Sequence, residues 1–145
     1  MSVLLGRELV VITKPALTID DVDAMGAKAT AEALANNWKV TIAICDEGGH
    51  LMWLRRLDGA APVSSYIAPQ KARTAAMGKR ESKVYEDVIN EGRTSFLSVP
   101  ELKGMLEGGL PILVDGYCVG AIGVSGVKSF EDAQIGRAGI AALKV

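Results

Sequence analysis

The sequence predicts a single α+β domain in which helices cover both faces of an antiparallel sheet of five strands. Two pairs of apolar runs are each joined by a short glycine-containing turn, at Gly48-Gly49 and at Asp115-Gly116. This pattern is typical of antiparallel hairpins. The first pair is apolar on both faces of each strand, which indicates a sheet covered on both sides. Segments with helix-start signals lie before, between and after the strands, and they supply the covering layers.

Composition limits the possible partners. The chain has 145 residues, 49% of them hydrophobic, and a formal net charge of −1. A domain of this size buries roughly 70% of its unfolded surface, so a full core is expected. The balanced charge and the small number of aromatic residues argue against nucleic acid and anionic membranes as partners.

The expected compartment is the cytoplasm. The N-terminus has neither the basic start nor the long apolar run of a signal peptide, and no apolar run reaches the length of a membrane span. Cys45 and Cys118 each lie within an apolar run, without the spacing of a metal site. We therefore expect two buried, reduced cysteines rather than a disulfide.

The first part of the chain is expected to pass from an irregular segment into a helix. Residues 1–16 show no regular pattern apart from a short extended piece at Glu8–Ile12. Thr18, followed three residues later by Asp21, predicts a helix N-terminus with a capping box. The two asparagines at 36–37 end this helix.

The first hairpin is predicted from strands at 39–45 and 50–57. Glycine adopts positive φ at little cost, so Gly48-Gly49 suits a two-residue turn between them. A second helix follows, capped by Ser64 or Ser65 and extending through about residue 77. Pro69 is tolerated only near a first helical turn, which places the start of this helix at 65–68.

The second half of the chain supplies the rest of the sheet. A short helix at 85–90 and a loop precede three predicted strands, near Met105-Leu106, at Leu110–Val114 and at Tyr117–Val124. Ser129 is expected to cap the last helix, with Asp132 in the capping-box position. The five strands and the flanking helices form one domain over residues 1–145.

A glycine-rich strand ends near a candidate anion site. The run VGAIGVSG, from Val119 to Gly126, lacks both the spacing and the strand–turn–helix context of a dinucleotide-binding fingerprint. Its glycines allow either close packing of another backbone or the floor of a ligand site. Ser125, Gly126 and the N-terminus of the last helix together offer donors for a carboxylate or phosphate.

His50 is the only histidine in the sequence and directly follows the two glycines of the first hairpin. It is either a hydrogen-bonded turn residue, a general base or a metal ligand. No second histidine is available for a zinc site, whereas axial ligation of a cofactor metal by one imidazole is geometrically simple. Lys71 and Arg73 could pair with an acidic arm of such a ligand if their helix lies over the hairpin.

These motifs resemble a known family. The phrases DEGGHLMWLRRLDGA, KARTAA, GGLPI and VGAIGVSG, with a final helix ending in AGIAAL, resemble the GlcG-like, HbpS-like haem-binding family. That family also supplies the C-terminal domain of PduO-type corrinoid adenosyltransferases. The likeness extends over residues 17–145. It places the family's GGH phrase on Gly48, Gly49 and His50, its RMDGA-like phrase on Arg56–Ala60 and its KARTA phrase on Lys71–Ala75.

The resemblance implies a profilin-like three-layer α/β/α fold with a five-stranded sheet and a homo-oligomer, either dimer, tetramer or octamer. It also implies binding of haem or a corrinoid, in a role accessory to glycolate, glycerol or diol metabolism. The candidate ligand-binding residues are thus His50, as axial ligand, with Gly48, Gly49, Arg56, Lys71, Arg73, Ser125 and Gly126.

Three functions remain open at this point. The first is tetrapyrrole binding without catalytic turnover. The second is an enzyme or sensor for a small carboxylate or hydroxy acid, held by Lys71, Arg73 and the N-terminus of the last helix. The third is a structural accessory subunit. No set of catalytic residues is identified, and whether the protein is an enzyme is left open.

Overall fold

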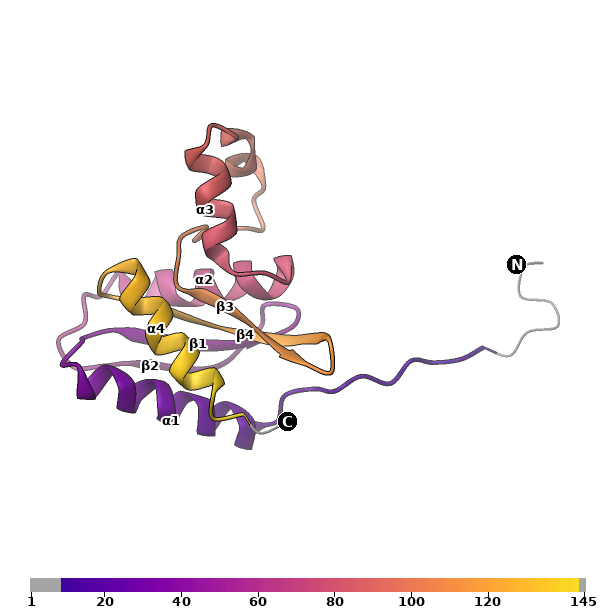
Figure 1. Ribbon diagram of the computed structural model, residues 1–145, viewed down its shortest axis with the longest axis horizontal. Helices are drawn as coiled ribbons and strands as arrows, with labels where there is room; N and C mark the ends of the chain where they lie inside the picture. Colours follow the sequence, from indigo (N-terminus) through magenta and orange to yellow (C-terminus); the bar gives the residue numbers. More distant parts are fainter. Residues whose placement is uncertain (1–8, 144–145) are drawn as a thin grey trace.

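The computed structural model describes residues 9–143 and shows an antiparallel sheet between two layers of helices (Figure 1). Helix α2 packs on one face of the sheet, while α1 and α4 pack together on the other. The elements are α1 (Ile19–Ala35), β1 (Thr41–Asp46), β2 (Leu51–Arg56), α2 (Ser64–Gly78), α3 (Ser82–Asn90), the 3₁₀ helix η2 (Thr94–Ser98), β3 (Gly109–Val114), β4 (Tyr117–Ser125) and α4 (Ser129–Ile140). The predicted α+β class and antiparallel sheet are confirmed. Within the described range, no helix is both long and apolar enough to cross a membrane.

The sheet has four strands, in the order β2-β1-β4-β3, and not the five predicted. The expected strand at Met105-Leu106 is an irregular segment between Gly104 and Gly108, which have φ values of 69° and 128°. Its neighbouring carbonyls are satisfied by side chains of the helices. The Thr74 hydroxyl donates to Lys103 O, and the Ser82 hydroxyl donates to Leu106 O. With these partners, the segment does not need a neighbouring strand.

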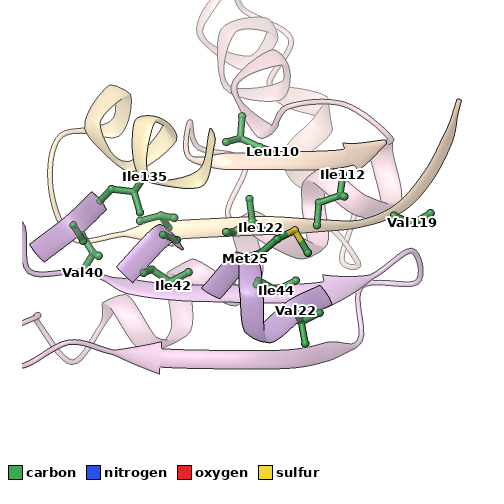
Figure 2. Close-up of a cluster of buried hydrophobic side chains, with 13 residues drawn as sticks. Val22, Met25, Val40, Ile42, Ile44, Leu110, Ile112, Val119, Ile122 and Ile135 are labelled. Carbon is green, nitrogen blue, oxygen red and sulfur yellow. The ribbon is translucent and has the colours of Figure 1, made fainter. Parts of the chain in front are cut away.

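The two faces of the sheet are packed differently. Large aliphatic side chains fill the layer beneath α1 and α4, where Met25, Ile42, Ile122 and Ile135 are fully buried (Figure 2). The α2 face is lined by small residues: Cys45, Ala72, Ala75, Ala76 and Ala121. A Cβ at Gly123 would collide with the α2 backbone at Ala68 and Ala72. At this glycine the structure therefore supports close packing rather than a ligand floor.

The start of α1 was predicted correctly, whereas the starts of α4 and α2 differ from the prediction. At α1, Asp21 N donates to Thr18 Oγ1 and Thr18 N donates to Asp21 Oδ2, which confirms the capping box. At α4 the N-cap is Lys128 and not Ser129, and Glu131 accepts from its backbone N–H. Asp132 does not cap this helix because it is buried against another side chain, described below.

Helix α2 begins earlier than predicted, at Ser64, with Val63 as its N-cap and no side-chain cap. Pro69 therefore lies inside the helix. The Ser64 hydroxyl is used otherwise, because it donates to Ala61 O and lies 2.7 Å from the Thr41 hydroxyl. These contacts fix the start of α2 against β1, and this long-range restraint is absent from the local sequence pattern.

The first hairpin turn has three residues rather than two. Asp46 N donates to His50 O and Gly49 N donates to Asp46 O, so Glu47, Gly48 and Gly49 form the loop. Only Gly49 has a positive φ, at 80°. This is the arrangement of a tight turn followed by one left-handed residue. The second hairpin turn is as predicted, with positive φ at Asp115 and Gly116.

Strand β2 lies at one edge of the sheet and is largely exposed. Its Trp53 side chain turns towards α1, where the indole occupies the space in which a Cβ of Gly26 would lie. The guanidinium of Arg55 stacks over the same indole at 5.6 Å. The other face of β2 extends beyond α2 and is left open to solvent.

Candidate functional site

His50 and Asp46 form the centre of the candidate site, at the turn between β1 and β2. The imidazole Nδ1 lies 3.0 Å from Asp46 Oδ1 and 3.1 Å from Oδ2. A carboxylate can only accept, so Nδ1 carries a proton, and in the neutral ring the lone pair is on Nε2. In the described part of the chain, Nε2 has no hydrogen-bond partner, and the side chain is 76% exposed.

The backbone of the turn holds the carboxylate in place. Gly48 N and His50 N both donate to Asp46 Oδ1, at 2.9 and 3.0 Å. Partial burial alone would raise the pKa of Asp46, but these two bonds and the His50 ring together lower the pKa below its ordinary value. The carboxylate therefore stays ionised in weak acid and continues to orient the ring.

The two glycines make room on either side of this pair. A Cβ on Gly48 would lie 2.7 Å from His50 Cε1, so a side chain there would push the imidazole away. A Cβ on Gly49 would lie 2.6 Å from Arg73 Cγ and 3.4 Å from Met77 Sδ. The turn is thus pressed against the exposed end of α2, as expected if that helix lies over the hairpin.

A half-open cleft of about 390 Å³ lies beside the turn. It has apolar and cationic walls, formed among others by Lys14, Glu47, Met77, Lys79, Tyr117 and Cys118. Glu47 belongs to the turn itself, and Met77 lies where a side chain on Gly49 would meet it. The cleft therefore adjoins the turn that carries the His50–Asp46 pair, and its walls come from this turn, the end of α2 and the β3–β4 turn.

The predicted site residues are not all brought together. Gly48, Gly49, His50 and Arg73 are neighbours at the end of the hairpin. Arg56, Ser125 and Gly126 lie at its opposite end, where Thr41 pairs with both Arg56 and Ser125. Arg56 lines a different cleft, of about 500 Å³, with Trp38 and Asp58. The length of β1 separates the two groups.

Lys71 lies beside Ser125 and Gly126, but its side chain points into the domain. Its side chain is buried, and Nζ donates to Val124 O at 2.9 Å and to Asp132 Oδ2 at 3.1 Å. Its charge is balanced inside the domain, so we leave Lys71 out of the proposed site. Lys71 therefore gives no support to the anion site expected at the N-terminus of α4, since its charge is already paired with Asp132.

The cysteines are free thiols. Cys45 is buried, and this burial raises the pKa of its thiol to about 12. Cys118 is half-buried at the rim of the cleft beside the turn, where its Sγ faces Ala76 O at 3.6 Å. The expectation of two unpaired cysteines is confirmed, although only one is fully buried.

Comparison with known proteins identifies the family of this chain and agrees with its fold. The model of the family described as "Haem degrading protein HbpS-like" matches residues 17–141. This chain belongs to the HbpS-like family. Its relative GlcG of Escherichia coli strain K12 is 50% identical over 113 residues, which span 78% of this chain and 84% of GlcG.

Two solved structures superpose over nearly the whole chain. The crystal structure of HbpS gives a TM-score of 0.85 at 28% identity, over 93% of this chain and 95% of HbpS. The structure of the PduOC:haem complex gives 0.81 at 28% identity, over 89% of this chain and 96% of PduOC. The family resemblance drawn from the sequence is therefore confirmed.

Sequence reasoning missed several residues of the site in this HbpS-like chain. Met77 follows Arg73 by four residues on α2, so helical spacing alone could have placed both on one face. Tyr117 flanks the Asp115-Gly116 turn, but nothing local shows that this turn lies beside the other hairpin. Lys14 and Lys79 come from segments whose positions depend entirely on the tertiary fold.

Proposed function

We propose that this protein binds haem at the β1–β2 turn, with His50 as an axial ligand of the iron. The observation that carries the proposal is the pairing of His50 Nδ1 with Asp46, which leaves Nε2 free on an exposed ring. Histidines that bind metals nearly always donate their other N–H to a carboxylate, a carbonyl or water, and this donation fixes the tautomer and raises ligand basicity. The family description and the haem complex of PduOC support the same ligand.

The surroundings of His50 fit haem in their chemistry. Met77, Leu113 and Tyr117 give the neighbouring cleft apolar walls against which a porphyrin can pack. Arg73, whose Nε donates to Glu101 O, and Lys79 supply cations for propionate groups. Bound haem supplies a redox-active iron, and the protein supplies an oriented ligand and a partly apolar surface.

The test is titration with haemin, followed by visible absorption, of the unmodified protein and of His50→Ala. The variant should lose the absorption band of the histidine-ligated iron and bind at least ten-fold more weakly. Because the ring is exposed, the midpoint of thermal unfolding of the variant should barely differ from that of the unmodified protein. Added imidazole should restore the band by occupying the vacated position.

A matched control lies in another cleft, of about 440 Å³, between α2 and α3. This cleft is the more apolar of the two, but it contains no histidine. Leu97→Asp changes its lining at an exposed position and should leave haemin binding intact. Unaltered spectra in His50→Ala, or loss of binding in Leu97→Asp alone, would place haem away from the turn. The cytoplasmic location and the accessory role in glycolate, glycerol or diol metabolism stay predictions of the sequence.

A further inference from the structure

The N-terminal arm, residues 9–13, is an apolar segment that lies off the domain. It reads Leu-Val-Val-Ile-Thr, and its four apolar side chains are exposed by 75% at Ile12 to 86% at Val11. β-Branched residues of this kind favour extended strands. Figure 1 shows the arm leaving the body of the molecule as a long extended stretch. A run of four exposed apolar residues is unfavourable in water, so burying it against another protein surface is favourable.

The base of the arm is fixed and directs it outwards. Leu17 packs against the main core, and Lys14 Nζ lies 3.7 Å from Glu47 Oε1 in the first hairpin turn. Pro15 restricts the preceding residue to extended conformations, so the chain does not reverse at Lys14. The arm is thereby held pointing away from its own sheet.

The free edge of β2 is a surface of matching chemistry. Leu51, Met52 and Leu54 are exposed by 38–55%, although they belong to a strand. Leu57 N donates to Val40 O, so Leu57 bonds to the strand on the β1 side. Every second residue of an antiparallel strand bonds to the same neighbour, so the N–H and C=O of Leu54 and Arg56 point away from β1. In the part of the chain that the structure describes, no strand pairs with these groups.

The other edge of the sheet is less suited to accept a strand. β3 contains Pro111, which has no N–H to donate, and proline on an edge strand is a common means of blocking further pairing. β2 contains no proline, and its charged residues, Arg55 and Arg56, are confined to its C-terminal end. The half of β2 that follows His50 is wholly uncharged, as is the arm.

We infer that the arm of one copy adds as a fifth strand to the free edge of β2 in a second copy. The arm spans roughly 17 Å at about 3.4 Å per residue, close to the length of the apolar part of β2. Reciprocal exchange of two arms gives a closed twofold dimer, in which neither arm is left over to bind a third copy. The partner's arm then borders the strand that begins directly after His50.

The first test is solution mass with arm and edge variants. We expect an assembly larger than the 15.3 kDa monomer. Val10→Asp with Val11→Asp should lower that mass to half or less, because carboxylates cannot be buried along the strand. Leu54→Pro should do the same by removing one outward N–H. Leu34→Asp, at a leucine on α1 that is 64% exposed, is the matched control and should leave the mass unchanged.

The second test distinguishes an arm that pairs with β2 of another copy from an arm that folds back onto β2 of its own chain. In a Cys118→Ser background, one preparation carries Val11→Cys and another, with a larger tag, carries Leu54→Cys. Mild oxidation of the mixture should give a disulfide-linked heterodimer. A third preparation carries Val11→Cys and Leu54→Cys in one chain. The inference would be overturned if the wild-type protein had a mass of 15.3 kDa, or if the arm variants left the mass unchanged. It would also be overturned if the disulfide formed only in this third preparation.

Discussion

Lys71 of α2 and Asp132 of α4, 61 residues apart in the sequence, meet inside the domain with Nζ 3.1 Å from Oδ2. Lys71 also donates to Val124 O, and Asp132 Oδ1 accepts from Val127 N. The pair therefore joins the helices from opposite faces of the sheet at the end of β4. A buried charge pair of this kind is costly to break, because removing one partner leaves the other uncompensated.

Lys71→Met should lower the free energy of unfolding by about 3–5 kcal/mol, since Asp132 then lies buried without its cation. Chemical denaturation at pH 7 measures the change. Lys71→Met combined with Asp132→Leu should recover most of the loss, and Lys83→Met, which breaks an exposed pair with Asp87, should have little effect. Equal losses in the Lys71 and Lys83 variants would contradict the structural role.

The same pair predicts a dependence of stability on pH. Burial raises the pKa of Asp132 to about 6, against the lowering influence of Lys71, from an ordinary value of 3.8. Between these values the folded protein binds more protons at Asp132 than the unfolded chain, so this group's contribution to stability falls as pH rises. The opposite sign holds for Asp46, whose pKa is lowered.

Asp132→Asn removes that titration. The difference in unfolding free energy between wild type and Asp132→Asn should therefore change in favour of the variant as pH rises from about 4 to about 6. Thermal or urea unfolding over this range gives the difference directly, and effects of other carboxylates cancel. A difference that is flat with pH would show that Asp132 does not titrate in this window.

Asp46→Asn tests the orientation of His50. The amide offers one acceptor oxygen in place of two and no charge, so the imidazole loses its fixed tautomer. Loss of such a partner typically costs 10–100-fold in metal affinity. We expect a haemin affinity reduced by about that factor, with the band of the histidine-ligated iron retained at saturation. Asp58→Asn, which makes the same change at an exposed position at the opposite end of the hairpin, is the control.

Gly49→Ala separates backbone strain from crowding. Gly49 and Gly116 both have φ of 80°, but only at Gly49 would a Cβ meet other atoms, on Arg73 and Met77. Gly116→Ala should cost about 1–2 kcal/mol, the strain of the left-handed conformation. Gly49→Ala should cost more and should also displace Arg73. Identical unfolding free energies for the two variants would mean that the turn does not press on α2.

Local signals predicted most of the fold. Thr18 with Asp21, and Asp115 with Gly116, each specify their conformation through near neighbours, and both appear as expected. Met105-Leu106 was wrongly predicted as a strand because its apolar character is strand-like. Its carbonyls, however, are satisfied by hydroxyls from α2 and α3, which no local pattern contains.

The candidate site was predicted only in part, for a similar reason. The GGH phrase identifies its own turn, since Gly48, Gly49 and His50 act on one another. Arg56 is six residues from His50, and a six-residue strand places these two at opposite ends of the hairpin. Lys71 belongs to a recognisable motif, but whether its charge faces a ligand or the interior depends on Asp132, far along the chain.

The contact between Gly26 and Trp53 has a consequence for how the family can diverge. The indole occupies the place of a side chain on α1, so the two positions share one volume. A residue larger than glycine at position 26 requires a residue smaller than tryptophan at position 53. Conversely, a smaller residue at position 53 would leave a cavity that alanine or a larger side chain at position 26 can fill. Among relatives, these two positions should therefore change together, each substitution being tolerated only in the presence of the other.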